Sequence, residues 1–307
     1  MKDLSVVIAA YNAEDTLGVQ LEALVGQGPD LDWEVVVVDN RSTDGTVAVA
    51  ESFADRLDLR VVSAPDRPSG AYARNVAVAT CDTPWILFVD ADDMVAPGWL
   101  EAMAGAMREH RFVAGRLDAK VLNSPSAISR TVPQGDGLQW WPVGPPLPHA
   151  GGGNMGIERS VYEAVGGFEP DLIGLQDVDF CWRVQLAGVP LHFVPEATLH
   201  VGLRSTLRSM WRQGRNYGAA QAEIEHRFAH VRPEDVPEAA RATPPEAARQ
   251  KSGKVAVLIG MVRSVPHPGA LIWQVGWYVG HKLGEPGRRA RARTARPRPV
   301  TIGGASS

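Results

Sequence analysis

The chain has 307 residues, 45% of them hydrophobic, and a formal net charge of −4 at pH 7. This length and composition can bury one large core or two modest ones, which excludes a small disulfide-stapled scaffold. The two cysteines, Cys81 and Cys181, lie far apart without CxxC spacing, so we expect reduced thiols, a cytosol-like compartment and no zinc site. The net charge gives no reason to expect nucleic-acid binding.

Strand-like and helix-like segments alternate through the first third of the chain. The first strand-like segment, residues 4–10, follows the N-terminus without a charged leader or an apolar signal segment, which disfavours secretion and favours a cytoplasmic location. The later segments are strands at 33–39, 59–63 and 85–89 and helices at about 15–25, 45–57 and 72–79. This βαβ alternation predicts an α/β fold with a doubly wound, mostly parallel sheet flanked by helices.

The pattern loosens between residues 112 and 147, where prolines recur and Trp140 and Trp141 interrupt polar sequence. We expect a mobile insert over the site here, followed by helices at 158–165 and 177–187 that glycines terminate. The expected organisation is a nucleotide-binding half at 1–115, an acceptor-binding and catalytic half at 116–230, a solvated linker at 231–254 and an apolar helical segment with a basic tail at 255–307.

The apolar C-terminal segment does not reach the roughly 20 continuous apolar residues that a membrane-spanning helix needs. Residues 255–262 and 270–279 are separated by Arg263 and two prolines, and a cluster of arginines follows at 288–298. Two interpretations stay open: an interfacial helix pair that contacts anionic lipid through residues 255–298 on the inner face of the cell membrane, or a hairpin that docks on the core domain.

Carboxylates stand at the ends of two of the expected strands. Asp39 ends the strand at 33–39, and the run Asp90-Ala91-Asp92-Asp93 follows the strand at 85–89. In an open parallel sheet the ligand crevice lies outside the carboxyl ends of the strands. We therefore predict one site that holds a cation and a polar, phosphorylated ligand.

Six short motifs follow one another along the chain: VVIAAYNAE at 6–14, VDNRSTDGT at 38–46, ARN at 73–75, DADD at 90–93, GGNM at 152–155 and QDVD at 176–179. Each alone is weak, but their order and spacing from Leu4 to about Tyr217 resemble those of family 2 glycosyltransferases. The resemblance implies a GT-A fold, here with a helical C-terminal extension, a nucleotide-sugar donor, a divalent cation (Mn²⁺ or Mg²⁺) and inversion at the anomeric carbon.

The resemblance assigns a donor pocket to nine residues: Ala10, Tyr11, Asn12, Asp39, Arg74, Asn75, Asp90, Ala91 and Asp92. Within it Asp39 reads the nucleobase, Asp90 contacts the ribose and Asp92 binds the metal, since a hard cation on carboxylate oxygen neutralises a diphosphate leaving group. Simpler structural roles remain open, namely a loop cap for Asp39 and a surface ion pair for Arg74.

Inversion needs a base on the face opposite the leaving group, because the acceptor hydroxyl must lose its proton as it attacks. The family supplies it from an acidic pair before a helix, which reads Gln176-Asp177 here, so Asp177 is the candidate base and Asp179 the second choice. A carboxylate in the first turn of a helix is also a favoured cap. That structural role for Asp177 stays open.

Further candidates surround this centre. Asn154, Gln176, Trp140 and Trp141 are the expected acceptor or sugar contacts. His200 is a candidate metal or diphosphate contact, with a core histidine as the alternative. Arg212 and Arg215, three residues apart on one helical face, suit the diphosphate.

These residues predict a metal-dependent hexosyl- or deoxyhexosyltransferase that uses a UDP-, dTDP- or GDP-sugar. Without a QxxRW motif or a membrane channel, transfer of a single sugar to a glycan or polyprenyl-linked acceptor of the cell envelope is the better hypothesis. A non-catalytic nucleotide-sugar binding protein is the alternative that Gln176 leaves open, because an amide replaces the expected acid. A nucleotidyltransferase fits less well, since residues 9–15 lack a glycine-rich, basic phosphate loop.

Overall fold

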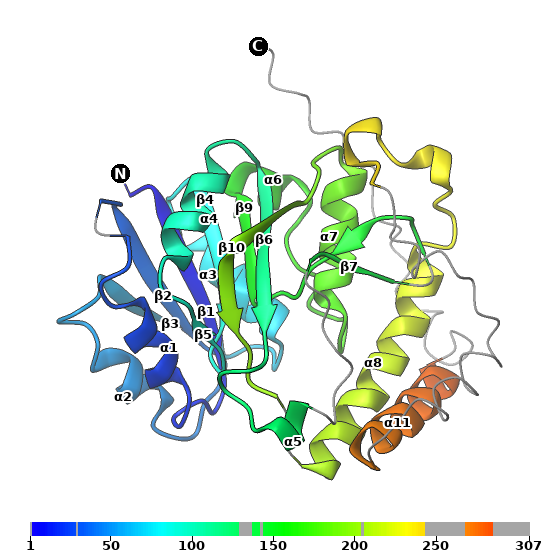
Figure 1. The fold of residues 1–307 in the computed structure, drawn as a ribbon, viewed down its shortest axis with the longest axis horizontal. Coiled ribbons are helices and arrows are strands. Elements are labelled where there is room, and N and C mark those ends of the chain that lie inside the picture. Colours follow the sequence, from blue (N-terminus) through cyan, green and yellow to red (C-terminus); the bar gives the residue numbers. More distant parts are fainter. Residues whose placement is uncertain are drawn as a thin grey trace.

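The computed structural model describes residues 2–28, 30–128, 137–141, 144–203, 206–242 and 268–284. Helices cover both faces of one eight-stranded sheet, with strand order β3-β2-β1-β4-β9-β6-β10-β5 (Figure 1). The strands are β1 Leu4–Ala10, β2 Trp33–Asp39, β3 Leu59–Ser63, β4 Trp85–Asp90, β5 Met94–Val95, β6 Phe112–Asp118, β9 Asn154–Glu158 and β10 His192–His200. A second, two-stranded sheet pairs β7 Gln139–Trp140 with β8 Pro148–His149.

The large sheet is mostly parallel. Strands β3, β2, β1 and β4 pair in parallel, β9 is antiparallel to both β4 and β6, and β10 is parallel to β6. The carboxyl ends of β1, β2, β4, β6 and β10 therefore lie at one edge. The predicted α/β class, with a mostly parallel sheet flanked by helices, is confirmed.

The helices divide between the two faces of the sheet. Their bounds are α1 Leu17–Leu24, α2 Thr46–Glu51, α3 Gly70–Ala79, α4 Trp99–Met107, α5 Pro125–Ile128, α6 Arg159–Ala164, α7 Gln176–Leu186, α8 Leu207–Arg227 and α11 Pro268–Gly284. Apolar residues of α1, α2 and α4 form the core on one face, and those of α3, α6 and α7 form the core on the other. Because both faces are covered, the run Val35–Val38 of β2 is buried throughout.

Two central strands lie where the sequence pattern indicated loops. β6 occupies the start of the expected insert, and β9 begins within the GGNM motif, for which no strand was expected. Gly115 explains the close packing at β6, because a Cβ there would lie 2.1 Å from the carbonyl oxygen of Ala197. Residues 129–136 and 142–143 of the expected insert lie outside the described residues.

The C-terminal part packs on α7 through a third core, which includes Trp182, Ile224 and Phe228. Two 3₁₀ turns, Pro233–Asp235 and Glu238–Ala240, fall in the expected linker, but Val236 and Ala240 are buried, so this part of it is packed rather than solvated. The segment 255–262 and the arginine cluster at 288–298 lie outside the described residues. No helix in the described ranges is long and apolar enough to cross a bilayer.

Candidate functional site

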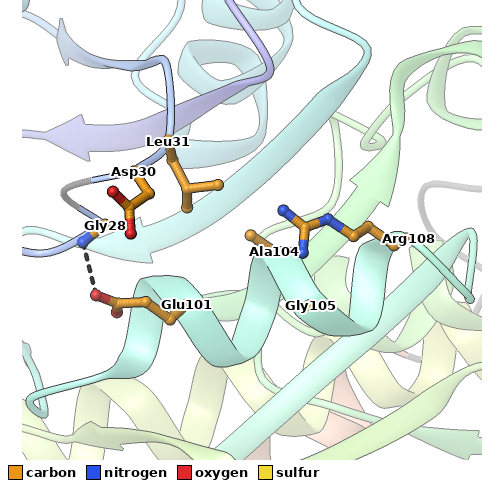
Figure 2. Close-up of a pocket in the computed structure, with 7 residues that line it drawn as sticks. All are labelled: Gly28, Asp30, Leu31, Glu101, Ala104, Gly105 and Arg108. Atoms are coloured by element: carbon orange, nitrogen blue, oxygen red, sulfur yellow. Dashed lines mark hydrogen bonds between the residues drawn. The ribbon is translucent and has the colours of Figure 1, made fainter.

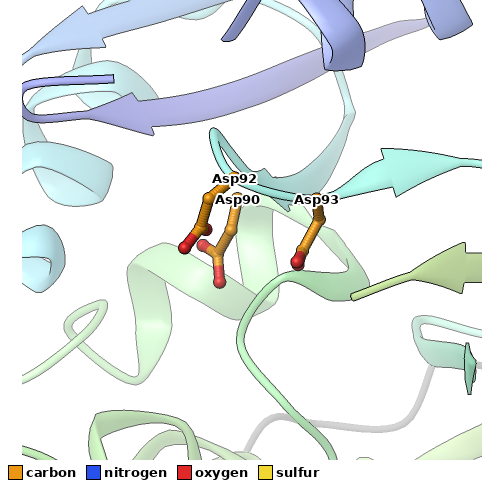
Figure 3. Close-up of side chains that lie close together, drawn as sticks. All are labelled: Asp90, Asp92 and Asp93. Carbon is orange, nitrogen blue, oxygen red and sulfur yellow. The ribbon is translucent and has the colours of Figure 1, made fainter. Parts of the chain in front are cut away.

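Three carboxylates gather just beyond the end of β4. The oxygen atoms of Asp90, Asp92 and Asp93 lie within 4.8 Å of one another (Figure 3). Asp92 is exposed, whereas Asp93 is buried and its Oδ1 accepts a hydrogen bond of 2.9 Å from the backbone N–H of Gly202. Burial and the charges of Asp90 and Asp92 raise the pKa of Asp93 to about 8. The site thus concentrates negative charge that a cation would offset.

A buried arginine faces this cluster from α3. The Arg74 guanidinium is ion-paired with Asp90 through Nη2 and Oδ1, and its Cζ lies 5.4 Å from the centre of the Phe168 ring. Its Nε has no hydrogen-bond partner among the described residues. Arg74 therefore holds Asp90 in place and keeps a buried donor for a further group, which goes beyond the surface ion pair considered from sequence.

The glycine turn before β9 lies between this cluster and α7. A Cβ on Gly153 would lie 2.7 Å from Oδ2 of Asp90, and one on Gly152 would lie 3.5 Å from Cβ of Asp177. Asp90, Arg74 and Asp177 thus surround one short stretch of backbone. Two of the sequence-predicted centres, the carboxylates after β4 and the acid of α7, meet across these glycines.

Asp177 lies in the first turn of α7 and is only partly exposed. Its Oδ1 accepts a hydrogen bond of 2.9 Å from the N–H of Val178, and burial raises its pKa although that bond and the Arg74 charge lower it. The N-cap residue of α7, Leu175, is buried with a left-handed φ of 54°, a strained conformation for a leucine that changes the direction of the chain at this point. Gln176 donates through Nε2 to the Leu172 carbonyl, 2.6 Å away.

The loops after β1 and β2 are joined to each other. The N–H of Asn12 donates to Ser42 Oγ at 3.0 Å, and Asn12 Oδ1 accepts from the N–H of Thr43 at 2.9 Å. Asp39 Oδ1 accepts from the Ser42 N–H at 3.1 Å, so it does cap its loop, while its neighbour across the sheet edge, Tyr11, is 63% exposed. Ala10 is buried at the end of β1, and Ala91 is buried directly after β4.

Two predicted ligand contacts are occupied by protein groups instead. Asn154 is 1% exposed, accepts from Trp99 Nε1 at 2.8 Å and donates to two backbone carbonyls, so the expectation that it contacts a sugar does not fit its surroundings. Asn75 bonds both the N–H and the C=O of Phe168 and also accepts from Tyr162. It therefore positions the turn at Phe168.

The remaining candidates lie at the margins of the site. His200 Nδ1 is 3.1 Å from Asp118 Oδ2, which places it beside the carboxylates but not among the three grouped ones. Arg212 and Arg215 are exposed on α8. Trp140 belongs to β7, and Trp141 packs at the edge of the third core with its ring 5.8 Å from that of His149.

Two acidic residues have surroundings that the sequence analysis did not anticipate. Asp93 received no ligand role there, although the motif DADD placed it next to Asp92, the metal candidate. Asp179 is fully buried and is paired with Arg183 at 2.8 Å and with Arg227 at 3.2 Å. Its spacing of four from Arg183 was the only available signal, and nothing in that spacing pointed to Arg227 of α8.

One small pocket lies elsewhere. It is lined by Gly28, Asp30, Leu31, Glu101, Ala104, Gly105 and Arg108, and Glu101 accepts from the Gly28 N–H at 2.8 Å (Figure 2). The pocket residues Gly28, Asp30 and Leu31 lie in the loop before β2, and Arg108 precedes β6. The pocket therefore lies at the edge of the sheet where these strands begin, away from the carboxylates.

Solved structures share this fold. A mannosyltransferase from Pyrobaculum calidifontis, solved with GDP-Man and Mn²⁺, aligns over 94% of this chain and 90% of its own with a TM-score of 0.58 and 19% identity. Residues 1–349 of TarS from Staphylococcus aureus, solved with UDP-GlcNAc, align over 91% of this chain and 90% of their own with a TM-score of 0.52 and 17% identity. At these identities the likeness establishes the GT-A fold.

Sequence relatives point the same way. The pre-mycofactocin glycosyltransferase of Mycobacterium tuberculosis is 28% identical over 234 residues, which are 73% of this chain and 47% of that protein. The chain thus matches only about half the length of that relative. The model of the family described as "Glycosyl transferase family 2" matches residues 5–166, more than half of the chain. The carboxylates after β4 and the glycine turn fall within that match, and the chain belongs to glycosyltransferase family 2.

Proposed function

We propose that the protein is an inverting glycosyltransferase that moves one sugar from a nucleotide diphosphate sugar to an acceptor hydroxyl. The observation that carries this proposal is the placement of Asp90 and Asp177 on either side of Gly152 and Gly153, with Arg74 near both. In this proposal a group that offsets phosphate charge and a group that accepts a proton lie on either side of one glycine turn.

The carboxylates fit a hard divalent cation. They offer only oxygen ligands, which Mn²⁺ and Mg²⁺ prefer, and they lie within 4.8 Å of one another. Asp92 would hold the ion, with Asp90 and Asp93 beside it. A bound cation would neutralise the charge that develops on the diphosphate leaving group.

The nucleotide would lie across the loops after β1 and β2. Asp39 is placed to accept from a base N–H, and the exposed ring of Tyr11 is available for stacking beside it. Arg74 has an unpaired Nε for phosphate, and Arg212 and Arg215 of α8 are the further diphosphate contacts we propose, with His200 as an additional metal or diphosphate contact.

Asp177 is the base we propose for the acceptor hydroxyl. Its raised pKa makes it a stronger base than an ordinary aspartate, and its position across the glycine turn from Asp90 suits attack on the face opposite the diphosphate. Leu175 and the buried Asp179 position it, the first through its backbone and the second by fixing α7 to α8.

A glycan or polyprenyl-linked acceptor of the cell envelope remains our proposal. TarS, which is 32% identical over 136 residues, is a poly(ribitol-phosphate) β-N-acetylglucosaminyltransferase, so one relative acts on such a polymer. The donor is a UDP-, dTDP- or GDP-sugar in this proposal. We place the protein in the cytoplasm, on the inner face of the membrane when its acceptor is lipid-linked.

The test is release of nucleoside diphosphate from a panel of UDP-, dTDP- and GDP-sugars with Mn²⁺ or Mg²⁺, with and without membrane extract. Native protein should release one nucleotide, and Asp92→Asn and Asp177→Asn should each lower the rate by at least about a hundredfold. Asp55→Asn, an exposed aspartate away from the site, is the matched control. Donor binding without release would favour the non-catalytic binding protein, and absence of any binding would overturn the proposal.

A further inference from the structure

One side of helix α11 packs closely against α8. Glycines bring the two backbones together: a Cβ on Gly218 would lie 1.9 Å from the Trp277 carbonyl oxygen, and one on Gly280 would lie 1.9 Å from that of Arg215. Gly214 near Trp273 extends the same contact. The pairs advance in the same direction along both helices, so α8 and α11 run parallel and their contacting sides are fixed (Figure 1).

The opposite side of α11 is apolar and open. Leu271, Val275, Tyr278 and Lys282 follow one another at helical spacings of four, three and four, which places them on one face. Leu271 is 43% exposed and Val275 and Tyr278 are each 46% exposed. The glycines that contact α8 lie about half a turn away from these positions. This outer face, defined by these four residues, therefore points away from the body of the protein.

The charge near this face is mostly basic. Residues 207–222 of α8 and all of α11 contain no aspartate or glutamate, while Arg208, Arg212 and Arg215 are exposed on α8. Near the end of α8, Glu225 lies 3.4 Å from His281 of α11. The chain after α11 has six arginines at 288–298 and one acid, Glu285. Since the whole chain carries −4, the sequence after α11 is far more basic than the chain as a whole.

We propose that the outer face of α11 docks on the surface of an anionic lipid bilayer. An apolar stripe flanked by basic residues lies in the headgroup region with its apolar side chains in the acyl boundary, and each arginine near an anionic surface adds attraction. Tyr278 and Lys282 suit that boundary, because both have an apolar body and a polar end. A stripe one helix wide is small for a stable protein dimer, which buries about 800 Å² per partner.

Docking would bring the carboxylate site to the membrane. Gly202, which follows β10, lies against Asp92, and α8 begins at Leu207, so the helix pair starts at the edge of the sheet where the site lies (Figure 1). That this placement would give the site access to a lipid-linked acceptor rests on the proposed function. The docking itself needs neither donor nor turnover.

The test is co-sedimentation of the full chain with phosphatidylcholine vesicles that contain 0 or about 30% phosphatidylglycerol, an anionic fraction large enough for the attraction of basic segments. We expect binding to the anionic vesicles alone, weakened by salt. Val275→Glu should weaken it by about tenfold, since it replaces one inserted apolar side chain by a charge. Val19→Glu on α1 is the matched control, because Val19 is also 46% exposed, and it should bind like the native chain.

Three results would overturn the proposal. The first is native binding by Val275→Glu, and the second is an equal loss in Val19→Glu. The third is a native dimer that Val275→Glu converts to a monomer while vesicle binding is unchanged, since the face would then join two copies. Lys282→Glu, a change at an exposed position, repeats the test with little risk to folding and should also weaken binding. Donor turnover measured without vesicles would stay native in both α11 variants, which separates this proposal from the transferase one.

Discussion

Gly153 lies so close to Asp90 that a side chain on this glycine would displace the carboxylate: a Cβ there would lie 2.7 Å from Oδ2. Both residues are held by the sheet, since Asn154, next to Gly153, pairs with Val89, next to Asp90. The β4–β9 ladder holds both backbones, so a side chain at residue 153 would have to push the Asp90 carboxylate aside.

Gly153→Ala should displace the Asp90 side chain and weaken donor and Mn²⁺ binding by at least about tenfold, as expected when a 1 Å shift disturbs a site. Isothermal titration with a nucleoside diphosphate and Mn²⁺ measures this. Gly105→Ala in α4 is the control, because nothing lies within 4 Å of its Cβ position and alanine favours a helix. Equal binding by Gly153→Ala and the native chain would contradict the geometry.

Asp177 should govern the pH dependence of turnover. A base must be deprotonated to act, so kcat/KM should fall as the pH drops through its pKa, and burial places that pKa above the ordinary aspartate value. In Asp177→Asn the residual rate should lose this acidic limb while donor affinity stays near native. Retention of the limb in the variant would assign it to another group.

Asp179→Asn should destabilise the fold by about 3 kcal/mol, because the change removes the negative charge that pairs with Arg183 and Arg227. The urea midpoint and slope give the free energy of unfolding. Glu163→Gln, which breaks the exposed Arg159–Glu163 pair of α6, should cost no more than about 0.5 kcal/mol. Similar losses in the two variants would refute the importance of the buried pair.

His149 should make stability depend on pH. Burial lowers its pKa to about 4, below the value near 6.5 of an unfolded chain, so the unfolded state binds the proton more tightly between these two pH values. The contribution of neutral His149 to the free energy of unfolding is fully present above pH 6.5. It is lost as the pH falls towards 4, by about 3 kcal/mol in total. His149→Phe should flatten the plot of unfolding free energy against pH in that window. An unchanged slope would disprove the assignment.

The first half of the fold could be predicted closely from sequence. The strands at 4–10, 33–39 and 59–63 have the bounds that were expected, because continuous apolar runs between turn residues leave few alternatives. β6 and β9 were missed because glycines interrupt them and their pairing is set by distant partners. The division of the chain at residue 115 and the acceptor contacts stay predictions.

Motif order predicted which carboxylates would lie close together, but their roles in a site stay predictions. Asp90 and Asp177 lie at one glycine turn, and Asp92 lies beside Asp90. Asn75 and Asn154 stand in the ARN and GGNM motifs, yet both form hydrogen bonds with protein groups. The sequence around an asparagine does not reveal whether its side chain will bond a ligand or the protein itself. Only the packed fold distinguishes these roles.

Adjacent residues of α3 link the two halves of the site: Arg74 holds Asp90, and Asn75 holds Phe168, whose ring lies beside the Arg74 guanidinium. Because Arg74 and Asn75 are neighbours in one helix, any shift of α3 would move the partner of Asp90 and the anchor of the chain before α7 together.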